Sequence, residues 1–167
     1  MPFFEPGLPE LLTRQVESGR LRFTTDLTEV ASFADVHFVC VGTPQLPGSF
    51  AADMQYVRGA VESLAPLLDR ECLVVGKSTV PSGTAAGLAR RIAELAPGGD
   101  RVELAWNPEF LREGFAVKDT LRPERLVIGV TSERADKVLR EVYAPLTDLE
   151  IPLIVTDFAT AELVKVA

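Results

Sequence analysis

The segment 72–84, CLVVGKSTVPSGT, decides the fold class of this 167-residue chain. It begins with a run of apolar residues, continues through a turn rich in hydroxyls, and leads into a segment where Leu88, Ile92 and Leu95 recur at helical spacing. A short apolar run followed directly by an amphipathic helix is typical of a βα unit. We therefore predict a strand over 72–77 and a helix immediately after it.

The same alternation extends in both directions along the chain. Further strands are predicted at residues 21–25, 36–41, 102–106, 126–130 and 152–156. The opening segment has helical periodicity that ends near Gly19, and Asp26 and Glu29 are spaced as a capping box at the start of a second helix. Several strands are apolar throughout, which favours an α/β fold with a parallel sheet and helices on both faces.

Composition narrows the range of partners. With 47% hydrophobic and 25% charged residues, the chain matches a soluble domain with one core. Its formal net charge of -7 argues against a nucleic-acid partner. The apolar runs are far shorter than the roughly 20 residues that span a bilayer, and the first residues do not resemble a secretory leader. We expect no membrane segment and a cytoplasmic location.

Both cysteines lie in predicted strands. Cys40 and Cys72 are therefore expected to be buried, reduced thiols rather than metal ligands or disulfide partners.

Three predicted strands end in loops that could carry chemistry, because ligands of open α/β sheets lie beyond the carboxyl ends of the strands. These strand exits are 41–44, 77–81 and 107–114. Each also fits a purely structural role. Thr43 suits a turn, as does Asn107 followed by proline. A helix cap would suit Ser78, Thr79 or Ser82, and a solvated surface would suit Glu109 and Glu113.

Taken together, these loops resemble those of the UDP-glucose/GDP-mannose dehydrogenase family. The resemblance covers essentially the whole chain and rests on segments 5–8, 18–21, 41–44, 77–81, 107–114, 122–129 and 161–165. It implies an NAD-dependent enzyme that oxidises the primary alcohol of a UDP-sugar to a carboxylate in two steps, holding the intermediate on a cysteine. Segments 113–114 and 122–125 look more like the branch that converts UDP-glucose to UDP-glucuronate than the GDP-mannose or N-acetyl-sugar branches.

The resemblance also implies roles for individual residues. Thr79, Glu109 and Lys165 are implied to be catalytic: a hydroxyl that orients water, a carboxylate for acid/base work, and an ammonium that stabilises negative charge on the substrate oxygen. The implied NAD contacts are Thr43, Ser78, Thr79 and Glu113. The implied substrate contacts are Glu109, Phe110, Leu111, Arg112, Glu113 and Lys165. No residue is expected to bind a metal.

One departure from the family concerns its phosphate-binding turn. The Gly-x-Gly-x-x-Gly turn that opens a Rossmann domain does not occur in the sequence. Residues 1–167 therefore correspond to part of an NAD-binding domain, an incomplete Rossmann-like sheet whose first βαβ portion is missing. The family's linking helix and second domain, which bears the nucleophilic cysteine, would follow this part.

The missing portion predicts unpaired strand edges and no activity for these 167 residues alone. The resemblance implies a homo-oligomeric parent enzyme. The alternative is a short, non-catalytic α/β protein that binds a nucleotide or a protein partner. Retention of Thr79, Glu109, Glu113 and Lys165 argues against it, because a binding module needs neither a general base nor a lysine for an oxyanion.

Overall fold

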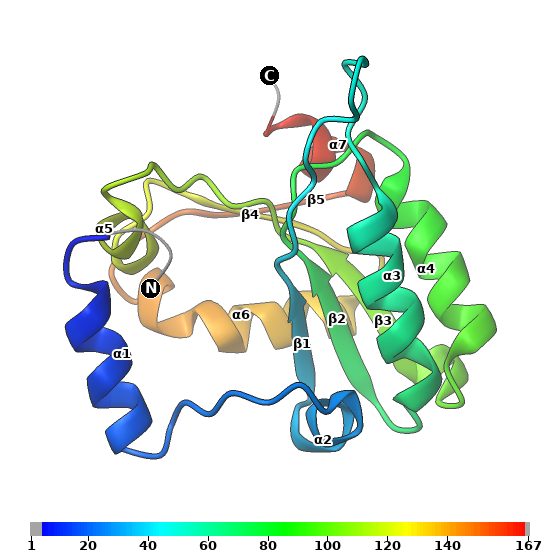
Figure 1. The fold of residues 1–167 in the computed structure, drawn as a ribbon, viewed down its shortest axis with the longest axis horizontal. Coiled ribbons are helices and arrows are strands. Elements are labelled where there is room, and N and C mark those ends of the chain that lie inside the picture. Colours follow the sequence, from blue (N-terminus) through cyan, green and yellow to red (C-terminus); the bar gives the residue numbers. More distant parts are fainter. Residues whose placement is uncertain (1–4, 166–167) are drawn as a thin grey trace.

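The computed structural model describes residues 5–165 and has a five-stranded sheet (Figure 1). The strands are β1 (Val36–Val39), β2 (Cys72–Gly76), β3 (Val102–Trp106), β4 (Leu126–Gly129) and β5 (Leu153–Thr156). Their spatial order is β1-β2-β3-β4-β5, so neighbours in the chain are neighbours in the sheet. Five of the six predicted strands are therefore confirmed to within two residues at either end.

Seven α-helices accompany these strands in the described part of the chain. They are α1 (Leu8–Glu17), α2 (Leu27–Phe33), α3 (Gln55–Leu64), α4 (Thr84–Leu95), α5 (Ala116–Leu121), α6 (Glu133–Thr147) and α7 (Phe158–Leu163). Short 3-10 turns, Ala65–Leu67 and Gly99–Arg101, lie before β2 and β3. No helix among residues 5–165 is long and apolar enough to cross a bilayer. The α/β class predicted from the sequence is confirmed.

The sheet is mixed rather than wholly parallel. β1, β2 and β3 pair in parallel, and so do β4 and β5, but β3 and β4 meet antiparallel through one pair, Trp106 and Gly129. The prediction of a parallel sheet was wrong at this junction. The connection from β3 to β4 contains only the 107–114 loop and the six-residue α5, rather than a long helix that covers the sheet.

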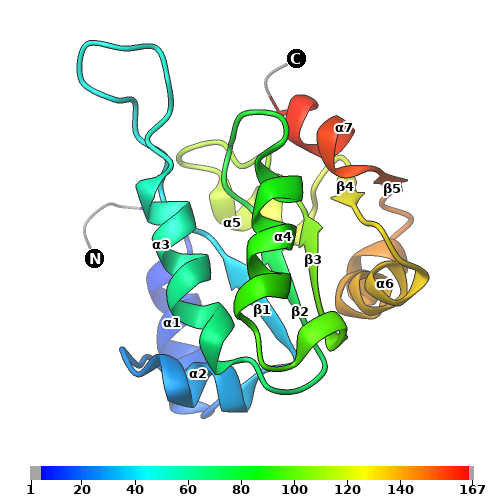
Figure 2. The ribbon, with the colours of Figure 1, turned by 90° about the vertical axis from the view of Figure 1, so that its right-hand side faces the viewer.

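Helices cover both faces of the sheet, as predicted. On one face α3, α4 and α7 bury a large apolar cluster that includes Val57, Leu88 and Trp106. On the other face α6 buries a smaller cluster around Val75 and Leu139. Figure 2 shows α3 and α4 side by side on one side of the sheet and α6 on the other. β2 is buried along its whole length because it lies between these layers.

The prediction of a strand at 21–25 was wrong. These residues follow α1 as an extended segment without strand pairing, because a strand requires a neighbour to bind its amides and carbonyls. α1 forms where predicted and ends near Gly19, whose φ of 72° is left-handed. It buries no residue, and Figure 1 shows it standing away from β1. Within the described residues, β1 pairs only with β2 and has one open edge.

The predicted capping box at α2 is half formed. The carboxylate of Asp26 accepts hydrogen bonds from the amides of Thr28 (2.9 Å) and Glu29 (3.4 Å). The side chain of Glu29 does not reach back to Asp26; it pairs with Arg22 instead. The Asp26 amide donates to the hydroxyl of Thr24. The helix start is therefore satisfied by a different partner from the one predicted.

Candidate active site

The loops after β1 and β2 are joined by two hydrogen bonds. The hydroxyl of Thr43 donates to the carbonyl of Thr79 at 2.8 Å, and the hydroxyl of Ser78 donates to the carbonyl of Val41 at 2.6 Å. The sequence left open a capping role for Ser78, but its hydroxyl binds the neighbouring loop. Figure 1 shows these loops at the same end of the sheet as α7. Three of the predicted cofactor residues therefore lie together.

Lys165 and Glu109 form the centre of the candidate site. The ammonium of Lys165, just beyond α7, donates to the backbone carbonyl of Glu109 and lies 3.1 Å from its Oε1. The two side chains are 21% and 34% exposed, so the charges interact outside bulk water, where Coulomb attraction is stronger. This contact joins two residues that are 56 positions apart in the sequence. Glu109 therefore makes an ion pair and remains partly exposed to solvent.

The ring of Phe110 lies between two cations. The Lys165 ammonium is 5.4 Å from the ring centroid and the Arg125 guanidinium is 5.1 Å from it. Both distances are within the range of favourable cation–π contact. The second oxygen of Glu109 accepts a hydrogen bond from the amide of Leu111 at 2.6 Å. Glu109, Phe110 and Lys165 thus form one cluster.

The other predicted substrate contacts lie outside this cluster. Leu111, Arg112 and Glu113 are exposed along the loop. Arg112 binds Asp119 in α5 through contacts of 2.7 and 3.0 Å. These hydrogen bonds lower the pKa of Asp119 to about 2, so the pair is ionic at neutral pH. Arg112 therefore fastens the loop to α5.

Two further groups of residues escaped the sequence analysis. Asn107, interpreted as a turn former, is 1% exposed and its amide oxygen accepts hydrogen bonds from Lys77 (2.9 Å) and Tyr143. Glu5 and Glu162 are 3% and 1% exposed, and each carboxylate binds two backbone amides. For Asn107, the one available signal in the sequence is its position directly after a strand. For Glu5 and Glu162 there is no such signal, because no local pattern distinguishes a buried carboxylate from a solvated one.

The cysteines match the prediction only in part. Cys72 is a buried free thiol in β2, as predicted, whereas Cys40 lies beyond the end of β1 and is exposed. Cys40 lies on the same face as Phe38, two residues before it, which is also exposed, whereas His37 and Val39 on the opposite face are buried. The local surroundings of each sulfur remove water and so raise the pKa of both thiols. Neither has the lowered pKa of a reactive thiolate.

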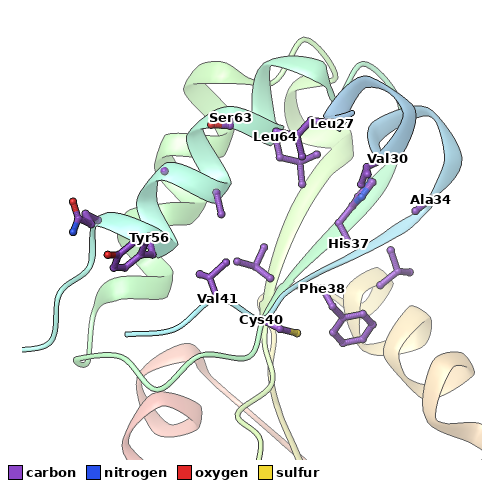
Figure 3. Close-up of a pocket in the computed structure, with 15 residues that line it drawn as sticks. Leu27, Val30, Ala34, His37, Phe38, Cys40, Val41, Tyr56, Ser63 and Leu64 are labelled. Atoms are coloured by element: carbon purple, nitrogen blue, oxygen red, sulfur yellow. The ribbon is translucent and has the colours of Figure 1, made fainter. Parts of the chain in front are cut away.

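A cavity of about 650 Å³ lies beside β1, between α2 and α3 (Figure 3). Its walls are mainly apolar, with Leu27, Val30 and Leu64 among them, and His37 is the titratable group buried there. None of the predicted site residues lines it. The cavity therefore belongs to the open edge of the sheet rather than to the Glu109–Lys165 cluster.

Residues 1–147 match the family model for the UDP-glucose/GDP-mannose dehydrogenase family, NAD binding domain. The chain belongs to this family. The family membership predicted from the sequence is therefore confirmed. Among the described residues, no group of three or more histidine, cysteine, aspartate or glutamate side chains could hold a metal ion.

Relatives and solved structures agree with this assignment. The chain is 47% identical to the UDP-glucose 6-dehydrogenase of Rhizobium meliloti, over 100% of the chain and 38% of the relative, and 42% identical to that of Rickettsia conorii, over 100% and 37%. A UDP-glucose dehydrogenase structure from Pyrobaculum islandicum matches with a TM-score of 0.89 and 44% identity, over 97% and 37% of the two chains.

A ternary complex of GDP-mannose dehydrogenase from Pseudomonas aeruginosa matches with a TM-score of 0.91 and 32% identity, over 99% of this chain and 38% of that one. The predicted Rossmann-like fold is confirmed by these likenesses. The chain spans less than two fifths of the length of the relatives it matches.

Proposed function

We propose that residues 1–167 form part of the NAD-binding domain of an enzyme that oxidises UDP-glucose to UDP-glucuronate. The observation that carries the proposal is the contact between Lys165 and Glu109 at the carboxyl ends of the strands. An ammonium beside a carboxylate can stabilise an oxyanion and exchange a proton within one site. Both relatives described above are named UDP-glucose 6-dehydrogenase, which favours this substrate over other nucleotide sugars.

The residues present fit the nicotinamide end of NAD. Thr43, Ser78 and Thr79 bring uncharged hydroxyls and backbone groups to the ends of β1 and β2, and Glu113 completes the proposed cofactor set. Because the sequence contains no Gly-x-Gly-x-x-Gly turn, these residues do not fit the pyrophosphate. When bound, NAD supplies the hydride acceptor for oxidation of the sugar alcohol.

Three side chains of this chain are proposed to act on the substrate. Glu109 accepts or donates a proton at its carboxylate, and the Lys165 ammonium stabilises negative charge on the substrate oxygen. The Thr79 hydroxyl orients water without adding charge. Because Lys165 binds Glu109, a substrate oxygen that approaches the ammonium would replace one of these contacts. Phe110, Leu111, Arg112 and Glu113 complete the proposed substrate wall.

The open edge of β1 supports the domain assignment. A strand with one free edge and an apolar cavity beside it is suited to receive a further βα unit. We propose that the glycine-rich start of the NAD-binding domain pairs there, and that a linking helix and a second domain complete the enzyme. The proposal extends to a homo-oligomeric parent enzyme in the cytoplasm, as the resemblance implies.

The isolated chain and a hybrid enzyme test the proposal. The 167-residue chain with NAD and UDP-glucose should form no NADH, measured by absorbance at 340 nm. A hybrid in which these residues replace the matched region of the Rhizobium meliloti relative should form NADH, and Glu109→Gln or Lys165→Met should reduce its rate by at least about 100-fold. Sustained turnover by the isolated chain, or a folded but inactive hybrid, would contradict the proposal.

A further inference from the structure

The loop that carries Glu109 is held at its first residue by a buried polar network. Asn107 receives hydrogen bonds from Lys77 and Tyr143 at its side-chain oxygen and donates to the carbonyl of Val127 at 2.8 Å. Its backbone amide donates to Gly76 at 2.8 Å. Through its side chain and its backbone amide, Asn107 is thus joined to β2, β4 and α6.

The far end of the same loop is held by Glu5. Its carboxylate accepts hydrogen bonds from the amides of Gly114 (2.9 Å) and Ala116 (2.6 Å). Glu5 is 3% exposed and lies more than 100 residues away in the chain. Such charge-assisted hydrogen bonds are stronger than neutral ones. We call residues 107–116 the Glu109 loop.

Between its two ends, the Glu109 loop is extended or turn-like and has little regular structure of its own until α5 begins at Ala116. A loop without an internal ladder of hydrogen bonds takes its conformation from its contacts with the rest of the chain, which here lie at its two ends and at Arg112. The Lys165–Glu109 contact and the Phe110 cluster lie within this segment. The two end contacts are therefore suited to fix where the Glu109 carboxylate lies.

Lys77 hydrogen-bonds only to neutral groups. Both of its hydrogen bonds go to Asn107, at 2.9 and 3.4 Å, and its ammonium lies 5.9 Å from the ring of Phe38. No ion pair involves it in the described part of the chain. Burial lowers the pKa of Lys77, which shows that the position disfavours the charge. The negative charge of Glu109 acts in the opposite direction and raises the pKa of Lys77. Lys77 is therefore coupled electrostatically to Glu109 and hydrogen-bonded to Asn107.

We propose that Glu5, Lys77, Asn107 and Tyr143 are positioning residues that clamp the Glu109 loop at both ends and so hold Glu109 against Lys165. The proposal rests on the function proposed above for Glu109 and Lys165. Preorganisation of this kind matters because a displacement of about 1 Å can cost a site up to 100-fold in rate.

Amide hydrogen exchange in the 167-residue chain tests the clamp independently of activity. Tyr143→Phe and Lys77→Met should each accelerate exchange at Leu111 by about tenfold, because they release the Asn107 end. The amides of β2 and β3 should keep their rates. Glu5→Gln should accelerate Phe115, at the other end, more than Leu111. Matched controls are Tyr56→Phe, Lys137→Met and Glu10→Gln, which should leave the loop unchanged.

Two exchange results would overturn the proposal. Acceleration spread evenly over sheet and loop would mean that these residues only stabilise the fold. Unchanged loop exchange would mean that they do not hold the loop.

Kinetics of the hybrid enzyme, with kcat expressed per folded enzyme, add a second readout. Tyr143→Phe should lower kcat by about tenfold while KM for NAD stays constant. Equal kcat values for this variant and the parent hybrid would contradict the positioning role. If the parent hybrid itself is inactive, the proposed function fails, whereas the exchange measurements still decide whether the clamp exists.

Discussion

The carboxylate of Glu162, in α7, accepts a hydrogen bond at 2.6 Å from the backbone amide of Gly83, the residue that precedes α4. Its other oxygen accepts a bond of 2.6 Å from the amide of Ala85. The first amides of a helix have no partner within the helix, and its positive dipole end favours a carboxylate. Glu162 thereby joins the helix before Lys165 to the segment that follows Thr79.

Replacing Glu162 should destabilise the chain. Glu162→Ala leaves the buried amide of Ala85 and the part-buried amide of Gly83 without acceptors, and we expect the free energy of unfolding to fall by about 3 kcal/mol. Glu162→Gln should lower the free energy of unfolding by less, because the side-chain carbonyl oxygen of glutamine can still accept a hydrogen bond. Urea unfolding followed by circular dichroism measures both. Glu141→Ala, at an exposed position of α6, is the control, and equal midpoints for it and Glu162→Ala would contradict the prediction.

Substitution by alanine should have opposite effects on stability at two glycines. A Cβ at Gly76 in β2 would lie 2.1 Å from a ring atom of Trp106, so Gly76→Ala should destabilise the chain by about 2 kcal/mol or more. A Cβ at Gly59 in α3 would meet no atom within 4 Å, so Gly59→Ala should stabilise it by up to about 1 kcal/mol. Thermal unfolding of both variants is the measurement, and a stable Gly76→Ala protein would show that Trp106 can move aside.

His37 should make stability depend on pH. Burial, and secondarily Arg70, lower its pKa, and neither ring nitrogen has a hydrogen-bond partner among the described residues. Below its ordinary pKa of 6.5 the unfolded chain therefore binds a proton before the folded chain does. The contribution of His37 to the free energy of unfolding is therefore complete above pH 6.5 and is lost as the pH falls from 6.5 through the pKa of the folded chain.

The single histidine of the chain makes this measurement simple. One imidazole signal should titrate in the NMR spectrum, with a midpoint below 6.5. His37→Leu should flatten the fall in stability between pH 6.5 and 5. A midpoint at or above 6.5 would contradict the assignment of a desolvated, unpartnered ring.

Tyr143 should lose its proton at a higher pH than an ordinary tyrosine. Removal from water raises its pKa to about 12, so the unfolded chain loses this proton first as pH rises. The contribution of Tyr143 to the free energy of unfolding is therefore complete below pH 10 and is lost between pH 10 and about 12. Absorbance at 295 nm should show a tyrosine step near pH 12 that Tyr143→Phe removes. A step that survives this substitution would belong to another group.

The local sequence predicted an element correctly where the residues of that element and their nearest neighbours determine its structure. The run from Cys72 to Gly76 is a strand because it is apolar on both sides and both sides are covered. Asp26 caps α2 because a capping carboxylate needs only amides two and three residues away. The family's three loops could be located for the same reason, since each directly follows a strand.

Local sequence failed where an element depends on a distant partner. The apolar segment 21–25 has the composition of a strand, but no strand lies beside it in the described chain. The direction of β4 relative to β3 was also mispredicted, because it depends on how the Glu109 loop and α5 turn the chain. Burial of Cys40 was overestimated for a similar reason, because packing leaves the face that it shares with Phe38 exposed.

By itself, the sequence determined the α/β class, the strands from residue 36 onward except the direction of one junction, and the family. These follow from periodicity and from motifs that span a few residues. Only the tertiary structure decided that Lys165 contacts Glu109, that Asn107 is buried beneath Lys77 and Tyr143, and that Glu5 and Glu162 bind helix starts. Burial and hydrogen bonding between residues tens of positions apart are properties of the folded chain, and no local pattern encodes them.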